Sequence, residues 1–149
     1  MGFFAKWNGV SNTSAARSLN YFTRLFTREL RNDELSDLVW ALAGIEALLI
    51  EGGRSSTGQL REKLGAIFGL DSNSPWLLES TEKMYAFRSK MVHGKRQLRS
   101  TFRTDDEEMG KRFDEEYDSA RFSVGILFLL LQEVSIRGIS EFRFKTIVT

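Results

Sequence analysis

The stretch from Asp105 to about Val134 constrains the fold most, because it is predicted to form one long helix. Its acidic first turn suits the positive end of a helix dipole. Its later half, which contains the run Val124–Leu131, is apolar on all sides. Such a helix must be covered all round, either at the centre of a bundle or in a subunit interface. The sequence therefore predicts a long final helix that other helices pack around.

Four earlier segments also have apolar residues at helical spacing, and turn residues separate them. Pro75, the only proline, suits the first position of a helix, with Ser74 as its N-cap. Gly69 and Gly94 are placed to end helices in a left-handed conformation. The pattern predicts an all-α, up-and-down helical bundle of four to five helices, the first four being Ser14 to Arg28, Glu34 to Ile50, Gln59 to Phe68 and Trp76 to about His93.

The length of 149 residues is typical of one domain, so we expect a single helical domain over 1–149. An apolar N-terminal arm covers about 1–12, and a tail of about 137–149 is expected to form an edge strand or an extended arm. Cysteine is absent, which excludes disulfides, thiolate metal sites and cysteine nucleophiles and is compatible with a reducing compartment. The run Val124–Leu131 is much shorter than the roughly 20 residues of a membrane span. We therefore expect a soluble, cytoplasmic protein without a membrane partner.

The net charge of +1 hides a separation of charge along the chain. The segment from Lys83 to Arg103 is basic and has no acidic residue, whereas Asp105 to Asp118 is rich in acids. A basic block of this kind often binds phosphate, and the alternative is that the two blocks pair with each other on the surface. The candidate RNA-binding residues are Lys90, Lys95, Arg96 and Arg99.

Two charged residues fall on the apolar faces of predicted helices. Met84, Phe87, Met91 and Val92 form one face of the fourth helix, and Arg88 lies near the centre of that face. In the second helix, Glu46 lies within a face that includes Leu35, Leu38, Val39, Leu42, Leu49 and Ile50. An ion without a partner is costly to bury. We therefore predict that Glu46 and Arg88 meet in space or line one polar cavity.

His93, the only histidine, lies five residues after Arg88 and directly before Gly94. An acidic residue in an apolar helix, followed by a helix that ends in Tyr85-x-x-Arg88-Ser89-x-x-Val92-His93-Gly94, resembles the HEPN superfamily and is most similar to its Apea-like subgroup. The resemblance covers roughly Leu35 to Lys95. It implies a helical bundle that commonly dimerises and is often a metal-independent ribonuclease.

Carried onto this chain, the resemblance implies Arg88 and His93 as the catalytic pair, with Glu46 as a supporting residue. Ser89 stands where catalytic members often have Asn, Asp or His, and some members have lost catalysis. Tyr85 is a candidate for stacking on a base, and its alternative is a place in the core. The resemblance makes RNA the expected substrate and a toxin or antiviral defence effector the expected role. An antitoxin or a larger defence protein is a candidate partner.

The chemistry expected of this pair is cleavage of RNA by its own 2′-hydroxyl. Imidazole exchanges protons near neutral pH, so His93 can accept the 2′-hydroxyl proton or protonate the leaving 5′-oxygen. The guanidinium of Arg88 can bind phosphate oxygens in a bidentate fork and stabilise the charge of the transition state. The reaction requires no metal, and the sequence offers no convincing ligand cluster, so we expect no metal and no cofactor.

A straight helix places Arg88 and His93 about 140° apart, so the two side chains do not share a face. A distorted last turn can swing His93 round, or a two-fold axis can bring the motifs of two copies together in a composite cleft. We expect both, and therefore a homodimer. Two alternatives stay open: a non-catalytic module that binds nucleic acid, a nucleotide or another protein, and a purely structural ion pair between Glu46 and Arg88.

Overall fold

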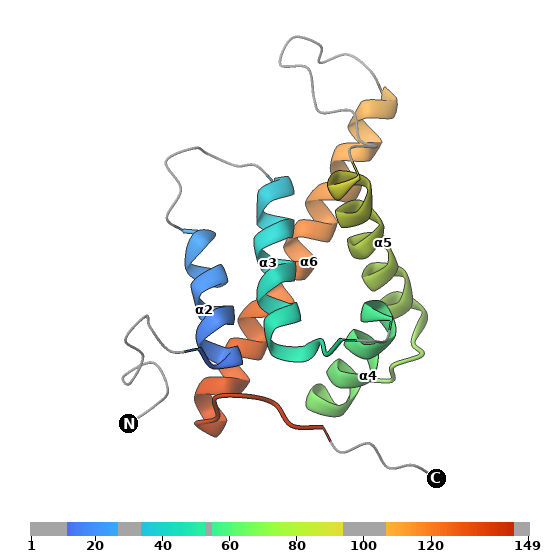
Figure 1. Ribbon diagram of the computed structural model, residues 1–149. Helices are drawn as coiled ribbons and strands as arrows, with labels where there is room; N and C mark the ends of the chain where they lie inside the picture. The colour runs from blue at the N-terminus through green and yellow to red at the C-terminus, as the bar shows by residue number, and fades with distance from the viewer. Residues whose placement is uncertain (1–11, 27–33, 53–54, 94–106, 145–149) are drawn as a thin grey trace.

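The computed structural model describes residues 12–26, 34–52, 55–93 and 107–144 of the chain. Five helices account for most of these residues, and the described ranges contain no strand. In Figure 1, α2 and α3 run in opposite directions, as do α5 and α6, while α4 is a shorter helix between α3 and α5. The predicted all-α helical bundle is confirmed, with the helices α2 (Ser14–Arg24), α3 (Glu34–Leu49), α4 (Ser56–Phe68), α5 (Pro75–Val92) and α6 (Glu107–Arg137).

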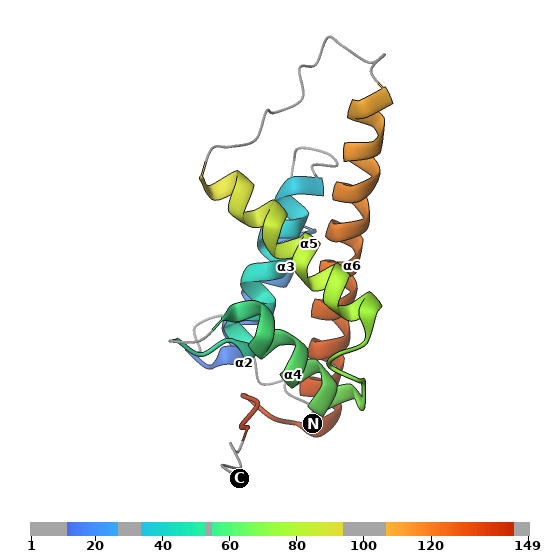
Figure 2. The ribbon, with the colours of Figure 1, turned by 90° about the vertical axis from the view of Figure 1, so that its right-hand side faces the viewer.

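Helix α3 lies at the centre of the bundle, between α2 and α6, and makes its most extensive contacts with these two helices. Its inward positions are small or apolar, so the three helices can approach closely. Helices α4 and α5 cover the remaining side of the α3–α6 pair (Figure 2). The fully buried centre of the core consists of Leu38, Leu42, Ile45, Leu49, Leu60, Leu64, Leu77, Met84, Leu127, Leu130 and Val134.

The boundaries of the helices differ from the predicted ones at several ends. Helix α4 begins at Ser56, three residues before the predicted start at Gln59. Gly69 ends α4 with φ of 67°, as predicted. Ser74 precedes Pro75, but its hydroxyl oxygen is buried without a hydrogen-bond partner, so the predicted side-chain cap of α5 is not formed. Helix α6 continues past Val134 to Arg137.

The described part of the tail, up to residue 144, packs on the bundle as an extended segment and not as a strand. The backbone N–H of Ala15 donates to the carbonyl oxygen of Ser140 at 3.0 Å, which attaches the tail to the start of α2. Phe144 packs against the core, and the Lys63 ammonium lies 4.8 Å from the centre of its ring. Of the two predicted forms of the tail, the extended arm is the one observed. The predicted N-terminal arm lies almost entirely outside the described residues.

By length and composition alone, one segment of the described chain, Glu116–Arg137 in α6, is long and apolar enough to cross a membrane. The core helix of a bundle meets the same criteria. In this segment Leu127, Leu130 and Val134 are fully buried in the core. The apolar part of this helix is therefore longer than the uninterrupted run Val124–Leu131 indicated.

Candidate functional site

The ion pair predicted between Glu46 and Arg88 is present. Arg88 Nη1 lies 3.0 Å from Glu46 Oε1, and the pair joins α5 to α3. Arg88 follows the fully buried Met84 by one helical turn, so it projects from the inner face of α5 toward α3. Its side chain is nevertheless 41% exposed, and that of Glu46 is 21% exposed. The pair therefore lies at the edge of the core and is open to solvent on the side of Arg88.

The position of Glu46 at this edge follows from the face that α3 buries. Of the predicted face, Leu38, Leu42 and Leu49 are buried, whereas Val39 and Ile50 are only partly buried. Ala41, Ile45 and Leu48 complete the buried stripe, which is therefore rotated relative to the predicted face. This rotation places Glu46 on the flank of the stripe rather than inside it. Burial raises the pKa of the Glu46 carboxyl above its ordinary value, and the positive charge of Arg88 opposes that rise.

Tyr85 completes this cluster from one turn before Arg88 on α5. Its hydroxyl oxygen is buried and has no hydrogen-bond partner in good geometry, and its ring packs against the core. Burial and the neighbouring negative charge of Glu46 raise the pKa of the Tyr85 hydroxyl. Because Tyr85 packs against the core and lies beside Glu46, its place in the structure favours a role in holding the Glu46–Arg88 pair in position. Its role in stacking on a base stays a prediction.

His93 lies just beyond α5 and is exposed. Its backbone N–H donates to the carbonyl oxygen of Ser89 at 3.1 Å, which is the regular α-helical bond. The expected distortion of the last turn is therefore wrong, and His93 and Arg88 leave the helix in different directions. Val92, predicted to lie on the apolar face, is 71% exposed because the end of α5 extends beyond the core.

The remaining predicted site residues fall into two groups. Ser89 and Lys90 are exposed on the last turns of α5, and the Lys90 ammonium lies 5.7 Å from the centre of the Phe87 ring. Lys95, Arg96 and Arg99 lie outside the described residues. The structure thus brings Glu46, Tyr85 and Arg88 into one cluster and places the lone histidine at the end of the same helix.

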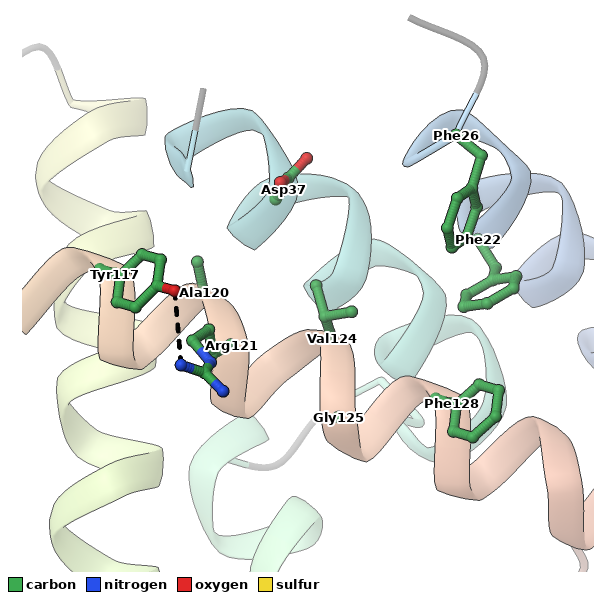
Figure 3. A pocket seen from close by; sticks show the side chains of 9 residues that line it. All are labelled: Phe22, Phe26, Asp37, Tyr117, Ala120, Arg121, Val124, Gly125 and Phe128. Carbon is green, nitrogen blue, oxygen red and sulfur yellow. Dashed lines mark hydrogen bonds between the residues drawn. The ribbon is translucent and has the colours of Figure 1, made fainter. Parts of the chain in front are cut away.

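Sequence reasoning missed an apolar groove on another face of the molecule. The groove has a volume of about 480 Å³ and lies between α2, the start of α3 and α6 (Figure 3). Aromatic rings from α2 and α6 form its walls, and the rings of Phe22 and Phe128 lie with their centres 6.3 Å apart. One feature of the sequence could have indicated the groove: the second half of the final helix is apolar on all sides and was expected to be covered by other helices or by a second subunit. The groove is lined by Phe22, Phe26, Asp37, Tyr117, Ala120, Arg121, Val124, Gly125 and Phe128.

A second hollow of about 230 Å³ lies between α5 and α6, around Trp76 and Phe122. Neither of these two hollows is lined by Arg88 or His93. Among the residues with a described position, no three His, Cys, Asp or Glu side chains are grouped so that they could hold a metal ion.

Comparisons with known protein families, with curated proteins and with solved structures found no match for this chain.

Proposed function

We propose that this protein is a metal-independent RNA endonuclease of the HEPN type, in which Arg88 and His93 act on the phosphodiester. One observation carries the proposal: Glu46 holds the guanidinium of Arg88 in place at 3.0 Å while the arginine side chain stays 41% exposed. A fixed cation that solvent can reach, followed on the same helix by an exposed imidazole, is a suitable pair of groups for phosphate chemistry.

In the proposed reaction, His93 accepts the proton of the RNA 2′-hydroxyl as the 2′-oxygen attacks the adjacent phosphorus. The bond from phosphorus to the 5′-oxygen breaks, and the leaving oxygen takes a proton from the imidazolium that His93 has become. The products are a 2′,3′-cyclic phosphate and a free 5′-hydroxyl. Arg88 stabilises the negative charge that develops on the phosphate oxygens. Ser89 and Lys90 border the site, and Lys95, Arg96 and Arg99 are proposed to bind the RNA backbone.

The proposal requires a second copy of the chain. Because the helix is regular up to His93, the two catalytic side chains of one copy point in different directions. A two-fold axis near the end of α5 would place Arg88 of one copy opposite His93 of the other. Such a homodimer would act on RNA in the cytoplasm as a toxin or an antiviral effector, with an antitoxin or a larger defence protein as its partner.

A second candidate is a non-catalytic module that binds nucleic acid, a nucleotide or another protein. This candidate is favoured by the ion pair of Arg88, because the positive charge of the guanidinium is already balanced by Glu46. In such a module His93→Ala would leave RNA affinity nearly unchanged, and binding would weaken steeply with increasing salt.

The experiment is incubation of the purified chain with RNA in EDTA at several pH values, next to the same sequence with 2′-deoxynucleotides. We expect cleavage of the RNA alone, with 2′,3′-cyclic phosphate ends. Intact RNA at every pH, or cleavage that requires a divalent metal, would refute the proposed activity. Binding of RNA without cleavage would support the second candidate.

A further inference from the structure

Helix α6 has an exposed stripe that its apolar composition makes unusual. The stripe lies away from Leu127, which packs on Gly44 of α3, and its residues follow one another at spacings of three or four along the helix. Large apolar side chains occur along its length, and the last of them, Ile136, is 78% exposed. Large exposed apolar side chains that gather on one side of a helix are typical of an interaction site. The stripe consists of Tyr117, Arg121, Gly125, Phe128, Gln132 and Ile136, with Leu129 beside it.

At the centre of the stripe, an empty space at Gly125 lies next to the exposed ring of Phe128. A Cβ atom placed on Gly125 would meet nothing within 4 Å, and Gly125 opens into the apolar groove between α2 and α6. Phe128, one turn further on, is 48% exposed (Figure 3). A glycine in the middle of an exposed helix costs about 1 kcal/mol relative to alanine and permits another chain to approach closely.

The stripe is also complementary to a second copy of itself that runs in the opposite direction. About a centre between Ile126 and Leu127, the exposed positions form three symmetric pairs. In two antiparallel copies of α6, Phe128 of one copy faces the hole at Gly125 of the other, and Tyr117 faces Ile136. Arg121 faces the neutral amide of Gln132, to which it can donate hydrogen bonds. In a parallel arrangement each Arg121 would instead face its equivalent, and the two like charges would repel each other.

We propose that a second copy of this chain docks on the α6 stripe in antiparallel orientation, with the Phe128 ring of each copy inserted beside Gly125 of the other. The contact is isologous, so one surface supplies both sides of the interface. The net charge of +1 per copy adds little repulsion between copies.

This contact goes beyond the proposed function and uses none of its residues. Helix α5 packs on the side of α6 that carries Ser119 and Phe122, which is a different face from the stripe. If both two-fold contacts form, the assembly is a closed tetramer or an extended array. Loss of one contact then halves the mass of a tetramer, and the two proposals can fail separately.

Disulfide cross-linking tests the antiparallel register, because the chain contains no cysteine of its own. In this register, residue 117 of one copy lies next to residue 136 of the other. The two copies of residue 117 lie about 28 Å apart along the helix pair, beyond the reach of a disulfide. Under mild oxidation, we expect an equimolar mixture of Tyr117→Cys and Ile136→Cys chains to form mixed dimers. Neither variant alone should cross-link. Cross-linking of either single variant with itself would overturn the proposal.

The mass in solution of Gly125→Leu provides the second arm of the experiment. A Cβ atom at this position meets nothing within 4 Å in its own copy, and the rest of the leucine side chain fills the hole that receives Phe128. We expect a mass half that of the wild type for a protein that is still folded. The matched control, Ala66→Leu, adds a similar side chain on the exposed face of α4 and should leave the mass unchanged. A wild-type chain that is monomeric at about 100 μM, a concentration at which most specific interfaces are occupied, would overturn the proposal.

Discussion

The carboxyl group of Glu46 experiences two opposing effects at one position. Its place on the flank of the core removes part of its hydration and disfavours the charged form, while the guanidinium of Arg88 favours that form. Because burial is the larger effect, the pKa of Glu46 is raised. The ion pair consequently fixes the position of Arg88 more than it stabilises the fold.

Single and double substitution of this pair measures how strongly the two charges are coupled. Because Arg88 is 41% exposed, we expect a coupling energy of about 1 kcal/mol among Glu46→Gln, Arg88→Met and the double variant. The measurement is urea denaturation of all four proteins at neutral pH. A coupling energy of about 3 kcal/mol or more, together with absence of RNA cleavage, would favour the purely structural interpretation of the pair.

The stability of the protein should depend on the ionisation of Glu46 in a defined direction. A carboxyl with a raised pKa in the folded state contributes stability below its unfolded pKa, and this contribution is lost as the pH rises through the folded pKa. Between about pH 4 and pH 7, the wild type should therefore lose stability relative to Glu46→Gln. Urea denaturation of both proteins across this range tests the sign. A relative gain by the wild type would show that Arg88 outweighs burial.

The ion pair between Glu46 and Arg88 was predictable from the sequence, because an unpaired charge on an inward helix face is costly to bury. The partial exposure of the pair was not predictable. It depends on which face α3 turns toward its neighbours, and the close approach of Gly44 to Leu127 of α6 favours the observed face. The regular last turn before His93 agrees with the predicted helix, and its distortion was expected only because it would bring the catalytic pair together.

At the scale of the helices, the contact between α3 and α6 depends on one small residue. A Cβ atom on Gly44 would lie 2.8 Å and 2.9 Å from the two methyl carbons of Leu127, whose side chain is fully buried. The close approach of the two helices therefore requires glycine at this position.

Substitution of Gly44 by alanine should destabilise the protein by about 1–3 kcal/mol, because overpacking outweighs the higher helix propensity of alanine. Gly58→Ala in α4 is the matched control, since its new Cβ atom lies 4.0 Å from Ser55 and only the propensity changes. We expect the control to gain about 0.5–1 kcal/mol. Equal effects of the two substitutions on thermal unfolding would contradict the close packing of α3 on α6.

Helical spacing predicted all five described helices, and most of their ends, because periodicity and turn residues are local properties. It did not predict the exposed stripe of α6. The second half of that helix is apolar on all sides, and the sequence cannot show which side the other helices leave uncovered. The alternative of a subunit interface, included in the prediction, is the one that the stripe now favours.

At the scale of the whole molecule, the bundle holds the middle of α5 in the core and leaves its last turn exposed. Met84 is fully buried, whereas Val92 and His93 are exposed. A site at such an end has few walls of its own, which is why the proposed activity depends on a second copy. Sequence alone could suggest this dependence only through the angle between Arg88 and His93 and through the resemblance to HEPN proteins.

Mixing of inactive variants tests whether the two copies share a site. If Arg88 of one copy acts with His93 of the other, each mixed dimer of Arg88→Ala and His93→Ala retains one intact site. Mixed dimers make up half of a randomised population, so the mixture should recover about a quarter of the wild-type activity. Each variant alone is the control. A mixture no more active than its components would show that each copy uses its own pair.

The rate of RNA cleavage by His93→Ala in EDTA tests the central claim most directly. His93 is exposed, so its removal should leave thermal unfolding unchanged. We expect the cleavage rate to fall by about 100-fold or more, the usual contribution of general acid–base catalysis. Arg24→Ala, which removes an exposed basic residue on α2, should cleave at the wild-type rate. A His93→Ala protein that is folded and cleaves as fast as the wild type would contradict the proposed site.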